Sequence, residues 1–134
     1  MINRESFDPS PLLEVSLLCT AEERSAPHAL MLEGPEASTE AVLRFLEPCF
    51  REPVMWKRRG APLEVPAGEI GVLILQDVDG LTAEEQSNLV RWIDANPHTK
   101  IVSTTAHRLF PLVTRGHFDI TLYYRMNVVL LHLV

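Results

Sequence analysis

The strongest structural signal in the chain is an unbroken run of four apolar residues, Val72 to Leu75. A strand with one face in water alternates apolar and polar side chains, whereas a strand covered on both faces has no such alternation. The run therefore predicts a buried strand in a parallel sheet, with helices above and below it. Gln76, Asp77 and Asp79 follow at once. They come at the carboxyl end of the strand, which is where α/β folds place ligands.

An amphipathic helix is predicted directly after this strand. Thr82 and Glu85 have the spacing of a capping box, in which each side chain accepts a hydrogen bond from the backbone of the other residue. The helix should run to about Asn96, because Pro97 prevents its continuation. The stretch from Gly71 to Asp94 is thus one strand, one tight turn and one helix.

The rest of the chain alternates short apolar or β-branched runs with stretches of helical spacing, which is typical of a mainly parallel, doubly covered sheet. An aromatic segment precedes the last strand, and the connection Lys57 to Gly68 is predicted to be the least structured part. The predicted strands are Ala29 to Leu32, Val54 to Trp56, Val72 to Leu75, Lys100 to Thr104 and Asn127 to Val134, and the further predicted helices are Pro11 to Arg24, Ala37 to Leu46 and Arg108 to Arg115.

Length and charge limit the classes of function. A chain of 134 residues with 46% hydrophobic side chains is long enough for one domain with a real core, and we predict a single domain over residues 1–134. The net charge of −6 repels phosphate backbones, so we expect no direct binding to nucleic acid. The one basic group, Lys57 to Arg59, is interpreted as a solvated loop.

The cellular location is predicted to be the cytoplasm. Cys19 and Cys49 lack CxxC spacing, no secretory signal precedes them, and both are expected to be core thiols. No apolar run approaches the roughly 20 residues of a membrane span. The five histidines lack HxxxH and HExxH spacing, so no metal site is predicted.

Two segments carry a resemblance to a known family. The segment GHFDITLYYRMNV, Gly116 to Val128, resembles G-x-F-R-x-D-L-Y-Y-R-L-N-V of the sigma-54-interacting AAA+ ATPases, the bacterial enhancer-binding transcription activators. The segment from Gly71 to Ile93 is similar to the family's central strand and helix without a gap, with Gln86, Leu89 and Arg91 in register. The resemblance implies a P-loop NTPase-like, three-layer α/β/α sandwich with a mainly parallel five-stranded sheet in the order 5-1-4-3-2.

The loop that matches the family's phosphate-binding loop departs from it. It begins at Gly34 and contains Ser38, but Thr39 replaces the second glycine and Glu40 the lysine. Pro35 also removes a backbone donor. A unit charge about 4 Å away contributes roughly 4 kcal/mol, so exchanging lysine for glutamate costs up to about 8 kcal/mol. A micromolar ligand has only about 8 kcal/mol in total. We therefore expect neither ATP nor Mg²⁺ as a cofactor.

The other family positions for ATP chemistry are altered as well. The aspartate and glutamate that hold magnesium and polarise water fall at Gln76 and Asp77, and the γ-phosphate sensor falls at Ala106, beside a loop residue, His107. The arginine that acts on a neighbouring subunit falls at Asp119, whereas a second arginine is kept as Arg125. By the same resemblance, we expect no counterpart of the GAFTGA insertion or of the helical lid. A shifted cation site at Asp77 or Asp79 remains open as an alternative.

These departures predict a chain that is not an enzyme. The first hypothesis is a non-catalytic, AAA+-derived binding or regulatory module whose protein partner is a sigma-54-dependent activator or a second copy. Its candidate interface carries Phe118, Asp119, Tyr123 and Arg125, with core packing of the aromatic residues as the competing interpretation. The second hypothesis is a weak ATP-binding or ATP-hydrolysing domain of a transcription regulator that needs residues from a partner.

Overall fold

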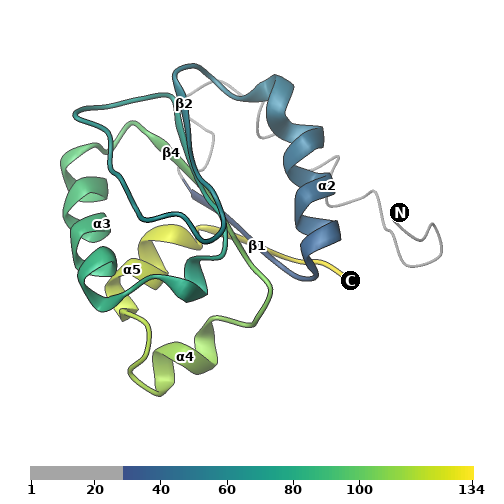
Figure 1. Cartoon of the computed structure of the whole chain (residues 1–134), viewed down its shortest axis with the longest axis vertical. Helices are drawn as coiled ribbons and strands as arrows, with labels where there is room; N and C mark the ends of the chain where they lie inside the picture. Colours follow the sequence, from purple (N-terminus) through teal and green to yellow (C-terminus); the bar gives the residue numbers. More distant parts are fainter. Residues whose placement is uncertain (1–28) are drawn as a thin grey trace.

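A parallel five-stranded sheet with helices on both faces forms the part of the chain that the computed structural model describes, residues 29–134 (Figure 1). The predicted helix Pro11 to Arg24, with Cys19, lies outside these residues. The strands are β1 (Ala29–Glu33), β2 (Val54–Lys57), β3 (Val72–Leu75), β4 (Lys100–Thr105) and β5 (Val129–His132), and the helices are α2 (Glu36–Leu46), α3 (Ala83–Ala95), α4 (Phe110–Thr114) and α5 (Ile120–Met126), with short 3-10 turns η1 (Glu47–Cys49) and η2 (Val78–Gly80).

The sheet has the order β2-β3-β4-β1-β5, which confirms the order implied by the family resemblance. Every neighbouring pair of strands is parallel. β3 lies between β2 and β4, and all four of its side chains are buried. The prediction from the unbroken apolar run, a strand covered on both faces, is therefore confirmed.

Two hydrophobic clusters separate the layers. On one face α2 packs its buried Val42, Leu43 and Leu46 against alternate residues of the strands. On the other face α3 and α5 pack against the intervening strand residues, while α4 lies near the carboxyl end of the sheet (Figure 1). Because successive strand side chains point to opposite faces, Val72 and Ile74 join the first cluster and Leu73 and Leu75 the second.

The capping box at the start of α3 is formed as predicted. The amide of Glu85 donates to the Thr82 hydroxyl at 3.1 Å, and the amide of Thr82 donates to Glu85 Oε1 at 2.9 Å. The second carboxylate oxygen, Oε2, accepts from the amide of Leu63 at 2.8 Å. One side chain therefore fixes both the helix start and the long connection between β2 and β3.

We expect Glu85 to make stability depend on pH. Hydrogen bonds from the backbone of Thr82 and Leu63 lower the pKa of its carboxyl. A depressed carboxyl pKa contributes stability above the ordinary glutamate value, and this contribution is lost as the pH falls through the folded-state value. As the pH falls below the ordinary glutamate pKa, Glu85→Gln should therefore lose less free energy of unfolding than the wild type. Urea denaturation at each pH measures this, with the exposed Glu84→Gln as the control; parallel curves for wild type and Glu85→Gln would contradict it.

Three predicted features differ in the structure. The predicted helix Arg108 to Arg115 is only the five residues of α4, because a tight turn around Thr105 and His107 precedes it. The aromatic segment is itself a helix, α5, begun by the Asp119 side chain. Cys49 is only partly buried, so the prediction of a core thiol is wrong for it. Within residues 29–134, no helix is long and apolar enough to cross a membrane.

Candidate functional site

The candidate site lies where β1, β3 and β4 end beside the first turn of α2. Gly34 follows β1 directly, and its amide donates to the carbonyl of Thr105 at the end of β4, at 3.0 Å. A Cβ at Gly34 would meet the carbonyl oxygen of Leu133 at 2.7 Å and its Cβ at 2.8 Å. Glycine is therefore required here by close packing against the end of the chain.

The loop after Gly34 turns into helix without a side-chain cap. The amides of Ser38 and Thr39 both donate to the carbonyl of Pro35 at 3.0 Å. The Ser38 hydroxyl donates to the carbonyl of Val134 at 2.7 Å, and the buried Thr39 hydroxyl donates to the carbonyl of Glu36 at 3.1 Å. These four donors serve contacts within the chain, whereas a phosphate-binding loop turns its amides toward the ligand.

Glu40 and Gln76 contact each other across the site. Gln76 Nε2 donates to Glu40 Oε1 at 2.8 Å, and the side chain of Gln76 is buried. The amide of Gln76 also donates to the carbonyl of Lys57 at the end of β2, at 3.0 Å. The two positions that correspond to the family's phosphate-binding lysine and magnesium-binding aspartate are thus joined in one hydrogen bond.

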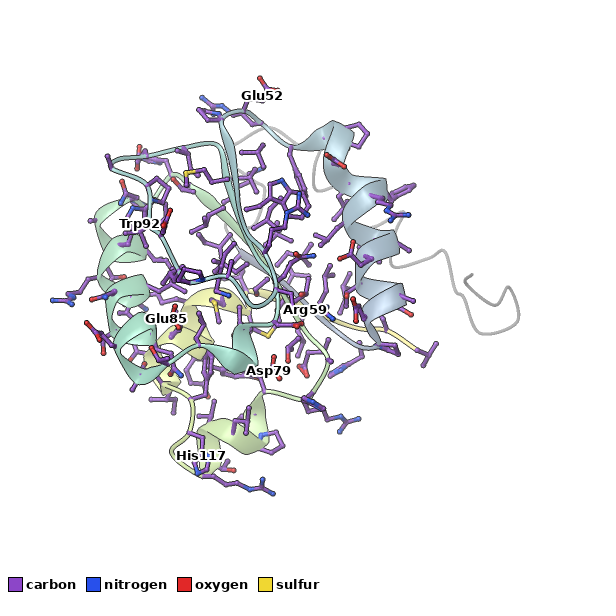
Figure 2. The ribbon with its side chains drawn as sticks, in the orientation of Figure 1. Glu52, Arg59, Asp79, Glu85, Trp92 and His117 are labelled. Atoms are coloured by element: carbon purple, nitrogen blue, oxygen red, sulfur yellow. The ribbon has the colours of Figure 1, made fainter. Side chains whose placement is uncertain are left out.

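Arg59 is a site residue that the sequence analysis does not identify. It extends from the connection after β2 to a position between α2 and the turn that carries Asp79 (Figure 2). Its guanidinium pairs with the carboxylate of Glu36, and its Nε lies 2.6 Å from Asp77 Oδ2. The interpretation of Lys57 to Arg59 as a solvated loop is wrong for Lys57, which belongs to β2 and is buried, whereas Arg59 is an exposed loop residue that is ion-paired. The sequence did contain a signal for this pairing, because the isolated basic run Lys57 to Arg59 is the natural partner for the several carboxylates of the predicted site.

Asp77 has an unusual backbone and an altered acidity. Its φ of 56° and ψ of 58° place it in the left-handed region, which aspartate tolerates better than most residues. The amide of Asp77 donates to the Thr104 hydroxyl at 3.2 Å. Burial raises the pKa of the Asp77 carboxyl, Arg59 opposes this rise, and Asp79 adds to it. The pKa of Arg59 is raised: burial opposes the rise, and the hydrogen bond with Glu36 and the charges of Asp77, Glu36 and Glu40 cause it.

The residues near the predicted sensor position form a turn. Ala106 and His107 are exposed. The amide of His107 donates to Thr105 Oγ1 at 3.2 Å, and its carbonyl accepts from the same hydroxyl at 2.8 Å. His107 is therefore a loop residue, as predicted. Within residues 29–134, no group of three or more His, Cys, Asp or Glu side chains is placed to hold a metal ion.

The residues of the candidate interface do not share one surface. Phe118 and Tyr123 are only 3% and 7% exposed and belong to the core under α3 and α5, so the core-packing interpretation holds for both. Asp119 begins α5 by accepting from the amide of Leu122 at 2.9 Å. Arg125 lies on the surface and pairs with Asp94 of α3, with Nε and Oδ1 2.9 Å apart. Phe118 and Tyr123 are therefore not surface residues, and the prediction that they contribute to an interface is wrong.

Taken together, Glu36 and Asp77 hold the guanidinium of Arg59, and the site presents carboxylates where a phosphate group needs cations. Four of its six sequence-predicted members, Thr39, Glu40, Gln76 and Asp77, are brought to one end of the sheet. Gly34 and Ser38 lie in the same loop but contact the end of the chain.

Comparisons with known proteins agree with this architecture. NtrX from Brucella abortus in complex with ATP matches with a TM-score of 0.66 and 20% identity over 98% of this chain and 39% of NtrX. The P-loop NTPase domain of a sigma-54 transport activator from E. coli matches with a TM-score of 0.62 and 19% identity, over 89% of this chain and 93% of that domain. Domain III of the replication initiation protein DnaA from Thermotoga maritima matches with a TM-score of 0.59 and 14% identity, over 100% of this chain and 69% of that one.

These structural similarities show the fold alone, an α/β sandwich like that of P-loop NTPase and AAA+ domains. The chain spans little more than a third of the length of NtrX. No curated protein sequence matches it. The family model of the sigma-54 interaction domain matches residues 60–134, which are more than half of the sequence. The chain belongs to the sigma-54 interaction domain family.

Proposed function

We propose that the chain is a non-catalytic, AAA+-derived binding or regulatory module of the bacterial cytoplasm. It acts through protein–protein contacts related to sigma-54-dependent transcription, with a complete activator or a second copy as its partner. The hydrogen bond between Gln76 and Glu40 supports this proposal most directly, because it joins two positions that would both face the nucleotide in an active relative. The fold is kept while its nucleotide-facing groups bind one another.

The residues of the site do not fit ATP with Mg²⁺. A triphosphate needs cations and free amides, but Glu36, Glu40 and Asp77 present carboxylates and two loop amides already donate to Pro35. Arg59 supplies one positive charge, but its guanidinium is held by two carboxylates. The neutral side chain of Gln76 replaces an anionic ligand for magnesium. We therefore derive no catalytic step through a bound nucleotide.

Glu40→Lys should not restore ATP binding, although it reverses the largest single charge term. Thr39 still carries a Cβ where close backbone approach is needed, Pro35 still lacks a donor, and Gln76 still offers no carboxylate. We expect the melting temperature of the variant to be unchanged by millimolar ATP and magnesium. If ATP did bind, a free ATP concentration of about 100 times the dissociation constant would raise the free energy of unfolding by about 2.7 kcal/mol.

The matched control is Glu47→Lys, which makes the same charge change at an exposed position just after α2. A nucleotide-dependent rise of several degrees in Glu40→Lys, but not in Glu47→Lys, would show that the pocket still forms. That result would contradict the proposal that this site is no longer a nucleotide site.

The proposed role as a binding module predicts a partner. Light scattering should detect a self-associated species, or a pull-down from bacterial lysate should retain a sigma-54-dependent activator identified by mass spectrometry. A chain that is strictly monomeric in light scattering and that retains no activator from lysate would count against the proposal. An ATP affinity tighter than about 10 μM would instead favour the second hypothesis, a weak nucleotide-binding domain completed by a partner.

A further inference from the structure

An exposed apolar surface lies on α4 and α5. The α4–α5 surface is defined here by Phe110, Ile120 and Tyr124, which are 50%, 55% and 59% exposed. The rings of Phe110 and Tyr124 both pack on the buried Tyr123, with centroid distances of 5.9 Å and 5.4 Å. Ile120 and Tyr124 are four residues apart on one helix and therefore share a face. The three exposed side chains are thus linked through Tyr123 and one face of α5, and exposed apolar groups that gather in this way mark sites of interaction.

The helix α5, which carries part of the α4–α5 surface, is held against α3 by side-chain contacts at both of its ends. Asp119 caps α5, and its amide donates to Gln86 Oε1 of α3 at 2.7 Å. Arg125 ties the other end of α5 to Asp94 of α3. Leu122 and Met126, on the opposite side of α5 from Tyr124, are fully buried. Because the helix is already held in place, a partner would meet a preformed surface and lose little free energy in ordering it.

The charge around this surface is opposite to that of the chain as a whole. Residues 107–128 contain three arginines and one aspartate, a net charge of +2, whereas the whole chain carries −6. Arg125 is paired and Asp119 caps α5. Arg108 and Arg115, which flank α4, are exposed and have no carboxylate partner within the described part of the chain. The surface therefore combines aromatic side chains with two uncompensated guanidinium groups.

We infer that the α4–α5 surface docks an acidic peptide segment with aromatic or aliphatic side chains, carried by a partner protein. This inference rests on the proposed function as a binding module and names its surface and the chemistry of its partner. Apolar side chains of the segment would cover Phe110, Ile120 and Tyr124, and its carboxylates would pair with Arg108 and Arg115. Two arginines can pair with the few carboxylates of a short peptide, but they are too few to offset the net charge of −6 against a nucleic acid backbone.

A phage-displayed library of random 16-residue peptides, selected on the full chain, tests this inference. We expect the enriched peptides to combine Asp or Glu with aromatic or aliphatic residues. Synthetic, fluorescently labelled versions should bind the wild type saturably in polarisation measurements. Their affinity should fall at least about tenfold in Tyr124→Ala and in the double variant Arg108→Glu/Arg115→Glu. Phe45→Ala, an equally exposed aromatic position on α2, should leave the affinity unchanged.

Other outcomes would overturn the inference. Enriched peptides that lack acidic residues, or that bind the α4–α5 variants as well as the wild type, would place the binding site elsewhere while leaving the chain a binding module. A selection that yields no binding peptide would remove this surface as a peptide site. Tight binding of a single-stranded oligonucleotide that Tyr124→Ala abolishes would assign the surface to nucleic acid, and a dimer weakened by the same variant would assign it to a second copy. A monomer that retains no partner from lysate would instead overturn the proposed function itself.

Discussion

Replacing Gly71 with alanine is expected to remove about 3 kcal/mol or more from the free energy of unfolding. A Cβ at this position would stand 2.6 Å from the carbonyl carbon of Arg51, closer still to its oxygen, and 3.1 Å from the carbonyl carbon of Glu52. These atoms belong to the backbone, which cannot rotate away as a flexible side chain can.

The backbone of Gly71 is itself held on both sides. Its amide donates to the carbonyl of Pro53 at 2.9 Å, and its carbonyl accepts from the amide of Lys100 at 3.1 Å. Relief of the clash would therefore break the contacts that lead into β2, β3 or β4. Urea denaturation measures the effect, with Gly68→Ala as the control because a Cβ there meets no atom within 4 Å. A free energy of unfolding for Gly71→Ala within about 0.5 kcal/mol of that of Gly68→Ala would contradict this packing.

Leu122→Ala should cost about 2–5 kcal/mol of the free energy of unfolding. Leu122 is fully buried on α5, in the cluster that includes Met31 of β1 and Leu89 of α3. Truncation removes three carbon atoms from the point where α5 meets the sheet, and the closely packed surroundings relax only partly into the cavity.

The neighbouring Tyr124→Ala provides a matched comparison for this cavity effect. Tyr124 lies two residues away on the same helix but is mostly exposed, and its ring contacts that of Tyr123. Its loss should cost at most about 1 kcal/mol. Equal destabilisation by the two variants would mean that α5 does not bury the face described. A folded Tyr124→Ala variant is also what the peptide-binding experiment requires.

Features that depend on residues close in sequence could be predicted. The run Val72 to Leu75 predicts β3 because its lack of alternation reflects cover on both faces. Thr82 and Glu85 predict the start of α3 because the two partners of a capping box are always three residues apart. The strand order followed from the resemblance to the sigma-54-interacting family, since local patterns specify strands but not their neighbours.

Contacts between distant residues could not be predicted. Arg59 meets Glu36 and Asp77 only because the connection after β2 returns over the end of the sheet, and the sequence pattern of that connection indicates only a loop. The hydrogen bond between Glu40 and Gln76 joins two residues that are 36 positions apart in the sequence. The charge at position 40 was informative by itself, but its partner became visible only once α2 and β3 were placed.

The aromatic residues near the end of the chain show a second limit. The family-like segment identifies Phe118, Tyr123 and Tyr124 as important without stating which of them face the core. Two adjacent residues of one helix, Tyr123 and Tyr124, differ completely in burial because they lie about 100° apart around the helix axis. The start of α5 at Asp119 fixes that orientation, and only the structure provides it.

We propose that the carboxylates and internal contacts of this site have replaced nucleotide binding. Isothermal titration calorimetry of the wild-type chain with ATP and magnesium tests it most directly. We predict no saturable heat of binding up to about 1 mM ATP. A dissociation constant of about 1 mM corresponds to only about 4 kcal/mol of binding free energy, and we expect ATP to bind more weakly than that. A saturating isotherm with one site and a dissociation constant tighter than about 10 μM, roughly 7 kcal/mol, would contradict the claim.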